Sequence, residues 1–191
     1  MTPTSGLAAH FDGLYERSSD PWSYESSDYE REKYASTLAA VPEGQISTAL
    51  ELGCSIGVFT EQLATRCERV LAIDFSERAL ALARDRLDQL DNVELCLASF
   101  PEQAPAGPWQ LIVCSEVLYY LQPPALDSAI AWLAEQLCRG ACVLVVSWRG
   151  RGVDEPFLGD DVHDRLAREL ARWHSLDGRR DGYRLDRFDG R

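Results

Sequence analysis

The chain has 191 residues, of which 46% are hydrophobic and 26% charged, and its formal net charge is −12. This length and composition suit one soluble globular domain, residues 1–191, and exclude fibrous and disordered classes. The acidic balance argues against a nucleic-acid partner, because phosphate binding depends on clustered Lys and Arg, and Lys33 is the chain's one lysine. We therefore expect a neutral or cationic small-molecule partner.

The cysteines and the first residues predict a cytoplasmic protein. Six cysteines occur, but none forms a C-x-x-C pair or a spacing that suits zinc, so we expect reduced thiols and no metal. Residues 1–10 lack the cationic start and apolar core of a signal peptide. The longest apolar runs, such as Ala141 to Trp148, are far shorter than the ~20 residues that span a bilayer, so no membrane partner is expected.

Strand-like and helix-like segments alternate along most of the chain. Residues 1–45, which are rich in aromatic side chains, predict a helix, a loop and a second helix. The predicted strands that follow are Thr48–Leu52, Val70–Asp74, Val93–Ala98, Gln110–Ser115 and Ala141–Trp148, and the predicted helices are Val58–Cys67, Glu77–Leu90 and Pro124–Leu137. This alternation predicts an α/β protein with a Rossmann-like, open, mostly parallel sheet and helices on both faces.

The last segment, residues 151–191, predicts a helix over His163–His174 and a short edge strand over Tyr183–Phe188. Because little chain remains after that strand, we expect a sixth strand but hardly a seventh. The expected organisation is an N-terminal helical lid (1–45), a cofactor-binding core (46–150), and a C-terminal helix and edge strand (151–191).

A glycine turn follows the first predicted strand, over residues 51–57. In this turn Glu51, Gly53 and Gly57 form an E-x-G-x-x-x-G pattern, and Cys54 follows the first glycine. Glycines there allow a ligand to approach the backbone and its N–H groups. The pattern differs from the G-x-G-x-x-G that holds a pyrophosphate. The alternative is a plain turn whose glycines serve packing alone.

Three further strand ends should meet at the same edge of the sheet, where open parallel sheets bind ligands. Asp74 ends the second strand about twenty residues after the glycine turn, and its carboxylate can accept both hydroxyls of a ribose. Ser99 and Phe100 follow the strand expected to lie over an adenine. Ser115 and Glu116 end the next strand, beside the expected reacting centre.

Together these features resemble the class I methyltransferases that use S-adenosylmethionine (SAM), and within them the nodulation protein S family. The matching segments cover nearly the whole chain. They are Phe11-Asp12-x-x-Tyr15, Asp20-Pro21-Trp22, Tyr29-Glu30-x-x-Lys33-Tyr34, residues 49–58, residues 115–120, Trp148-Arg149-Gly150 and Gly159-Asp160-x-x-His163.

The resemblance implies the class I methyltransferase fold, SAM as the cofactor, and roles for particular residues. It implies that Gly53 and Cys54 pack against the methionine part of SAM and that Glu51 supports their turn. Asp74 would bind the ribose and Phe75 would flank the adenine. Ser115 would lie next to the sulfonium, and Trp22 would fold over it as part of a lid. One departure is that Ser99 stands where many such enzymes carry an acidic residue for the adenine amino group.

Two side chains are candidates for accepting the proton that an amine loses on methylation. Glu116 leaves a strand end beside Ser115, and its alternative role is capping or a solvated loop charge. His163 opens a predicted helix that could overhang the crevice, and its alternative role is structural.

The expected function is N-methylation of a small acceptor, the free amine of a deacetylated amino sugar or oligosaccharide, which is the acceptor type of the resembled family. O-methylation of a small hydroxylated metabolite needs the same cofactor pocket and stays open. A non-catalytic SAM-binding module or nucleotide-binding regulator on the same fold is the third possibility. Nothing in the sequence gives the oligomeric state.

Overall fold

A computed structural model describes residues 3–152 and 155–190, with side chains from residue 6 onward. Residues 1, 2, 153, 154 and 191, which belong to the predicted N-terminal and C-terminal segments, lie outside this description. The helices are α1 (Pro3–Arg17), α2 (Asp28–Ala39), α3 (Val58–Ala64), α4 (Glu77–Leu87), α5 (Pro123–Cys138) and α6 (Gly159–Glu169), with a 3-10 turn η1 (Leu118–Tyr120). The strands are β1 (Ala49–Leu52), β2 (Val70–Asp74), β3 (Val93–Leu97), β4 (Leu111–Ser115), β5 (Cys142–Trp148), β6 (His174–Arg179) and β7 (Tyr183–Asp189).

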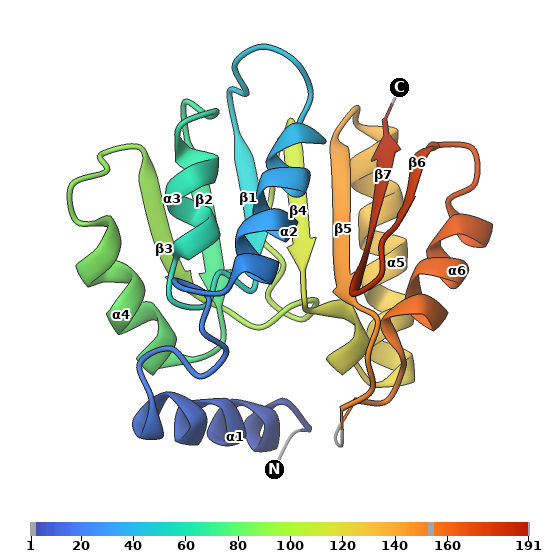
Figure 1. Cartoon of the computed structure of the whole chain (residues 1–191). Helices are drawn as coiled ribbons and strands as arrows, with labels where there is room; N and C mark the ends of the chain where they lie inside the picture. Colours follow the sequence, from blue (N-terminus) through green and yellow to red (C-terminus); the bar gives the residue numbers. More distant parts are fainter. Residues whose placement is uncertain (1–2, 153–154, 191) are drawn as a thin grey trace.

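The seven strands form one sheet in the order β3-β2-β1-β4-β5-β7-β6 (Figure 1). Strands β1 to β5 are parallel, whereas β7 runs antiparallel to both β5 and β6. The sequence therefore predicts the mostly parallel sheet correctly. The strand order reverses its direction at β1 and β4, and open sheets of this kind bind ligands at that point.

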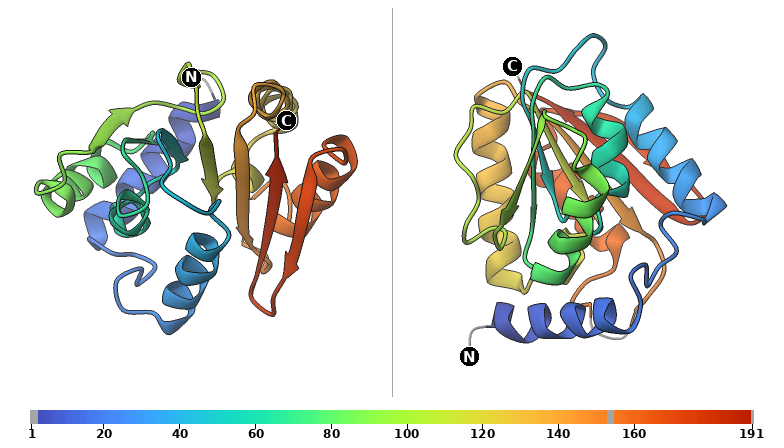
Figure 2. Two further views of the ribbon diagram at one scale, coloured as in Figure 1. Left: turned by 90° about the horizontal axis from the view of Figure 1, so that it is seen from above. Right: turned by 90° about the vertical axis from the view of Figure 1, so that its left-hand side faces the viewer.

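Helices cover both faces of the sheet, as Figure 2 shows. One face packs against α5 and α6, where Leu126, Ile130, Leu133 and Leu137 recur at helical spacing and are buried. The other face packs against α2, α3 and the start of α4. Strands β4 and β5 are buried on both faces, because their apolar runs lie between these two layers.

Local sequence explains where the helices begin. The Ser76 hydroxyl accepts a hydrogen bond from the Ala79 amide and caps α4, and Ser27 caps α2 in the same way. Pro123 and Pro124 open α5, where missing amide donors cost nothing. The helix α1 lies across the carboxyl ends of the strands and closes that side of the molecule (Figure 1).

The C-terminal segment differs from the sequence prediction. The last helix begins at Gly159 and ends at Glu169, so His174–Arg179 is free to form β6, the seventh strand that was not expected. The strand Tyr183–Asp189 is therefore not an edge strand, because it lies between β5 and β6. Most β6 side chains are exposed at the sheet edge, so this strand carries no alternating apolar pattern.

Candidate active site

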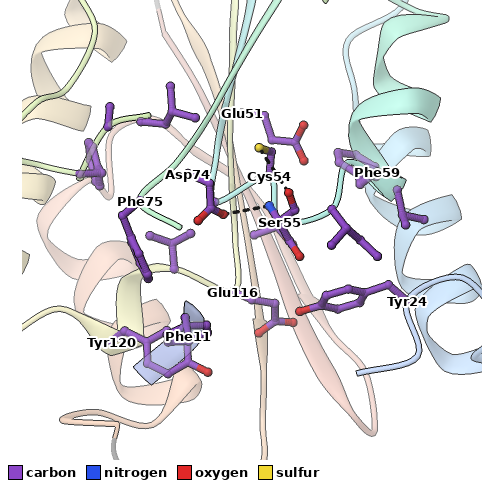
Figure 3. A pocket seen from close by; sticks show the side chains of 18 of the residues that line it. Phe11, Tyr24, Glu51, Cys54, Ser55, Phe59, Asp74, Phe75, Glu116 and Tyr120 are labelled. Atoms are coloured by element: carbon purple, nitrogen blue, oxygen red, sulfur yellow. Dashed lines mark hydrogen bonds between the residues drawn. The ribbon is translucent and has the colours of Figure 1, made fainter. Parts of the chain in front are cut away.

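A cavity lies at the carboxyl ends of β1, β2, β3 and β4, where the strand ends were predicted to converge. Helix α1 and the segment before α2 cover it from the outside. Figure 3 shows its side chains from close by. Eight predicted site residues line this cavity: Glu51, Gly53, Cys54, Asp74, Phe75, Phe100, Ser115 and Glu116.

The glycine turn has the backbone conformation that glycine permits. Gly53 has a φ of +75°, and a Cβ there would meet the Val117 side chain at 2.4 Å. Both facts explain why the turn after β1 requires glycine at this position. Gly57 has a φ of +80° and packs against Leu87 of α4, so it is placed away from the cavity wall. Gly57 therefore allows the turn to pack closely on α4.

Asp74 ends β2 with its carboxylate on the cavity wall. Its Oδ2 accepts the Ser55 amide at 2.9 Å (Figure 3). Its Oδ1 accepts the Ser76 amide at 2.8 Å. Burial raises the pKa of Asp74, although these two amide donors oppose the shift. Each carboxylate oxygen has capacity for one more hydrogen bond, which suits a pair of hydroxyl donors in the cavity.

Glu51 lies on β1 with only 2% of its surface exposed. Burial raises the pKa of this carboxyl to about 7. Its Oε2 atom is fully buried and makes no hydrogen bond of ordinary length with a described residue, although the nearby Thr60 hydroxyl lowers the pKa of this carboxyl. Such an orphaned acceptor on a cavity wall is costly unless a ligand donates to it. Glu51 is therefore suited to a cationic donor.

Glu116 follows β4 in a left-handed backbone conformation, with a φ of +59°. Its Oε2 accepts the Tyr119 hydroxyl at 2.7 Å and the Trp148 amide at 2.8 Å. Its Oε1 accepts the Lys33 ammonium at 2.7 Å. Lys33 also pairs with Glu30, so two carboxylates share one ammonium group.

A second hollow adjoins the cavity on the side of Glu116. The two share five lining residues: Phe11, Tyr24, Lys33, Glu116 and Tyr120. Aromatic and acidic side chains dominate the rest of the second hollow. They include Trp22, Tyr29, Glu30, Tyr119, Trp148 and Glu155. Glu116 therefore lies at the junction of two binding spaces.

Four predicted site residues do not line the cavity: Trp22, Gly57, Ser99 and His163. Trp22 contacts the rings of Phe11, Tyr15 and Tyr24 but lines the second hollow and not the cavity itself. Ser99 lies between two cavity residues, Ala98 and Phe100, but does not line the cavity itself. Neighbouring residues at a strand end face opposite sides, which explains this arrangement.

His163 is inside α6 and not at its start, and its side chain is fully buried. Its Nδ1 lies 3.0 Å from Asp186 Oδ2 on β7, and it lines neither the cavity nor the second hollow. The expectation that His163 overhangs the crevice is therefore wrong. The sequence prediction began this helix at His163, four residues after its start at Gly159. His163 was therefore expected at an exposed helix start, whereas the structure buries it inside the helix.

Sequence reasoning missed several residues of the N-terminal segment that line the cavity. These are Phe11, Tyr15, Tyr24 and Lys33. Phe11 contacts both Phe75 and Tyr120 edge to face, at centroid distances of 5.4 and 5.3 Å. The concentration of aromatic residues before position 45 was the available signal. That concentration does not indicate which of the aromatic rings face the cavity.

Comparisons with known proteins confirm the resemblance. A profile of the family described as nodulation protein S (NodS) matches residues 14–150. Nodulation protein S of Sinorhizobium fredii is 36% identical over 107 residues, which cover 56% of this chain and 50% of that protein. The chain spans about half the length of the curated relatives that it matches.

Solved structures agree with the fold. A crystal structure from Pseudomonas syringae, provisionally described as a methyltransferase, is 33% identical and covers 84% of this chain and 98% of that one, with a TM-score of 0.73. The N-methyltransferase NodS of Bradyrhizobium japonicum, solved with S-adenosylhomocysteine (SAH), is 24% identical. It covers 95% of this chain and 97% of that one, with a TM-score of 0.78. The predicted methyltransferase fold is therefore confirmed.

Proposed function

We propose that this chain, which belongs to the nodulation protein S family, is a SAM-dependent methyltransferase that acts on the amine of a small acceptor. The buried carboxylate oxygen of Glu51 is the observation that carries the proposal, because it can accept from the ammonium group of a ligand in a cavity that also holds Asp74. The finer proposal is an amino sugar or deacetylated oligosaccharide as acceptor, and the cytoplasm as the location.

The cavity residues fit the parts of SAM. The amino-acid ammonium of SAM would donate to Glu51 Oε2, and the methionine part would lie against the backbone of Gly53 and Cys54. The ribose hydroxyls would donate to Asp74. The adenine would contact apolar side chains alone, those of Phe75, Ala98 and Phe100, since Ser99 does not line the cavity. When bound, SAM supplies an electrophilic methyl group on a sulfonium centre.

The second hollow would hold the acceptor. Its aromatic rings can stack on a sugar or contact an ammonium group. Glu30 and Glu116 share the single ammonium of Lys33, so the cluster retains one uncompensated negative charge beside the cavity. That charge favours an amine over a neutral hydroxyl acceptor, because the amine becomes a cation as the methyl group is transferred.

The protein would accelerate the reaction mainly by alignment, as an in-line displacement at carbon requires. Glu116 Oε2 already accepts two hydrogen bonds, but Oε1 accepts only the one from Lys33. Oε1 therefore has capacity to accept an N–H of the acceptor, which would turn the nitrogen lone pair toward the cofactor cavity. A full proton transfer to Oε1 would weaken its ion pair with Lys33. Orientation is therefore the first role of Glu116, and its second role is to take a proton from an amine that arrives as an ammonium ion, which has no lone pair until it loses that proton.

Calorimetry and turnover assays with the purified protein test this proposal. SAM and SAH should bind, whereas NAD should not, because the glycine turn lacks the spacing for a pyrophosphate. A chitin oligomer with one free amine should be methylated in the presence of SAM, and the fully acetylated oligomer of the same length is the matched control. Tight NAD binding without a SAM signal would overturn the cofactor assignment. Equal methylation of both oligomers would overturn the amine assignment.

A further inference from the structure

Lys33 is the only lysine of the chain, which otherwise has eighteen arginines as its cationic residues. It lies on α2 with 2% of its surface exposed. Its Nζ is 3.0 Å from Glu30 Oε1 and 2.7 Å from Glu116 Oε1, and it lies 5.3 Å from the centre of the Tyr29 ring. The lysine ammonium carries three donors on one nitrogen atom, so it can bond to the carboxylates of Glu30 and Glu116 from one point. An arginine guanidinium spreads its donors over a planar fork and would not fit the same position in the same way.

The two ion pairs of Lys33 differ in what they connect. Glu30 lies one turn away on α2, so this pair is local to the helix. Glu116 lies 83 residues further along the chain, at the end of β4. The second pair therefore connects the N-terminal segment to the strand end where the acceptor would be held. An anchor for α2 alone would not require a partner on the wall of both binding spaces.

Lys33 cannot itself serve as the base. Burial opposes its positive charge, but the attraction of Glu116 and Glu30 outweighs this effect and raises the pKa of Lys33. The ammonium therefore stays protonated at neutral pH and only donates. Its effect on chemistry must pass through the carboxylates that accept from it.

The Glu116 carboxylate is fixed from two sides. Tyr119 and Trp148 donate to Oε2 from the same half of the molecule as Glu116 itself, and Lys33 alone donates to Oε1 among the residues of the structure. Without Lys33, the oxygen proposed to accept the amine N–H would lose the donor that sets its direction. Only the two donors to Oε2 would then oppose rotation about the last side-chain bond, so the direction of Oε1 would be less well defined.

We propose that Lys33 is a positioning residue, which holds Glu116 Oε1 in the direction that orients the acceptor amine. This inference rests on the proposed methyltransferase function and adds a coupling between α2 and the acceptor site. It predicts that the effect of Lys33 on catalysis depends on Glu116. A purely structural role of Lys33 predicts no such dependence.

A double-mutant cycle separates the two roles. Turnover at saturating SAM is measured for wild type, Lys33→Met, Glu116→Gln and the double variant. We expect Lys33→Met to lower kcat about tenfold in the wild-type background and less than twofold in the Glu116→Gln background. The SAH affinity should stay within about twofold throughout. Equal losses in both backgrounds, or a loss of SAH affinity, would overturn the inference.

Removing the ammonium leaves two carboxylates facing each other, and Lys33→Met could therefore fail to fold. The cycle is then run in a Glu30→Gln background, where the Lys33→Met variant has the same net charge in this cluster as wild type. The expected outcomes are the same. Wild-type protein that binds SAH but methylates no amine would refute the proposed function, and the inference with it.

The single lysine also allows a measurement that does not depend on activity. Protein labelled with ¹⁵N at the lysine side chain should give one ammonium resonance in NMR spectra, which belongs to Lys33. We expect Glu116→Gln to shift this resonance, and the exposed control Glu32→Gln on the same helix to leave it in place. A resonance unchanged by Glu116→Gln would show that the ion pair is absent in solution, and the inference would fail.

Discussion

The hydroxyl oxygens of Tyr15 and Ser55 lie 2.5 Å apart. This hydrogen bond joins α1 directly to the glycine turn, where Ser55 has a φ of +52°. A second contact, between Asp12 Oδ1 and the Ser76 hydroxyl, joins α1 to the start of α4. Helix α1 is therefore held against the two loops that carry Gly53 and Asp74 by polar contacts as well as by the packing of Phe11 and Tyr15.

The first prediction follows from the Tyr15 contact. Tyr15→Phe removes one hydrogen bond, which is worth about 0.5–1.5 kcal/mol, so SAH affinity should fall roughly two- to tenfold. Calorimetry on the purified variant measures this. The matched control is Tyr183→Phe, which removes a hydroxyl bonded to Ser36 away from the cavity and should leave SAH affinity unchanged. Equal effects of the two variants would show that α1 does not contribute to cofactor binding.

The second prediction concerns Asp74. Asp74→Ala removes the acceptor for the ribose hydroxyls and should weaken SAH binding by about 1.5–3 kcal/mol for each hydrogen bond to the charged carboxylate. The fold should persist, because water can reach the Ser55 amide in the cavity, and the buried Ser76 amide that loses its partner costs only about 1–3 kcal/mol. Circular dichroism and calorimetry check both points, with the exposed Asp88→Ala as the control. An unfolded variant would make Asp74 structural.

The third prediction concerns pH and Glu51, whose pKa is raised by burial to about 7. Its folded-state pKa lies above the unfolded value, so this group should cost stability as the pH rises from about 4.5 to about 7. A cationic donor favours the ionised form, so SAM binding should release a fraction of a proton near pH 6.5. SAM affinity should fall, by up to about tenfold per unit, as the pH drops below 7.

Calorimetry in two buffers of different ionisation enthalpy measures the released proton. Glu51→Gln should abolish both the proton release and this pH dependence, and the stability of the free protein should become flatter between pH 4.5 and 7. Proton release that persists in Glu51→Gln would assign it to another group and remove Glu51 from the ammonium site.

The fourth prediction addresses the buried pair of His163 and Asp186. Burial opposes the charge of Asp186, but His163 and Arg184 outweigh it and lower its pKa. His163→Gln should therefore destabilise the fold, by about 1–3 kcal/mol for an unsatisfied buried group. Turnover per folded molecule should be unchanged, because His163 lines neither binding space. Thermal unfolding and turnover are measured together, and a loss of turnover at wild-type stability would restore a catalytic role.

The strand ends were predictable from sequence because topology fixes them. In a parallel sheet the residues after each strand meet at one edge, so Gly53, Asp74, Ser115 and Glu116 could be placed without knowing any contact. Side-chain direction was not predictable to the same degree. Ser99 differs from its neighbours only by one position along a strand end, and one position reverses the side that it faces.

Two other failures have separate physical causes. The strand β6 lies at the sheet edge with exposed side chains, so no apolar period marks it in the sequence. The ion pair between Lys33 and Glu116 joins residues 83 positions apart. No local pattern encodes that contact, because it arises only when α2 packs beside the end of β4.

The last prediction concerns Glu116. Glu116→Gln keeps the side-chain shape but removes the charge that faces the acceptor. If Glu116 orients the amine through a charge-assisted hydrogen bond and then receives its proton, turnover at neutral pH should fall by roughly 10²–10⁴, with SAH affinity nearly unchanged. Part of this loss should recover as the pH approaches the pKa of the acceptor amine, because an amine that arrives neutral no longer needs a proton acceptor. The recovery should be incomplete, since orientation is lost at every pH. Turnover is measured at saturating SAM over that pH range, with Glu155→Gln as the matched control in the second hollow. Full recovery at high pH would leave proton transfer as the only role of Glu116. Wild-type turnover across the range, or a loss of SAH affinity in place of rate, would remove Glu116 from the mechanism.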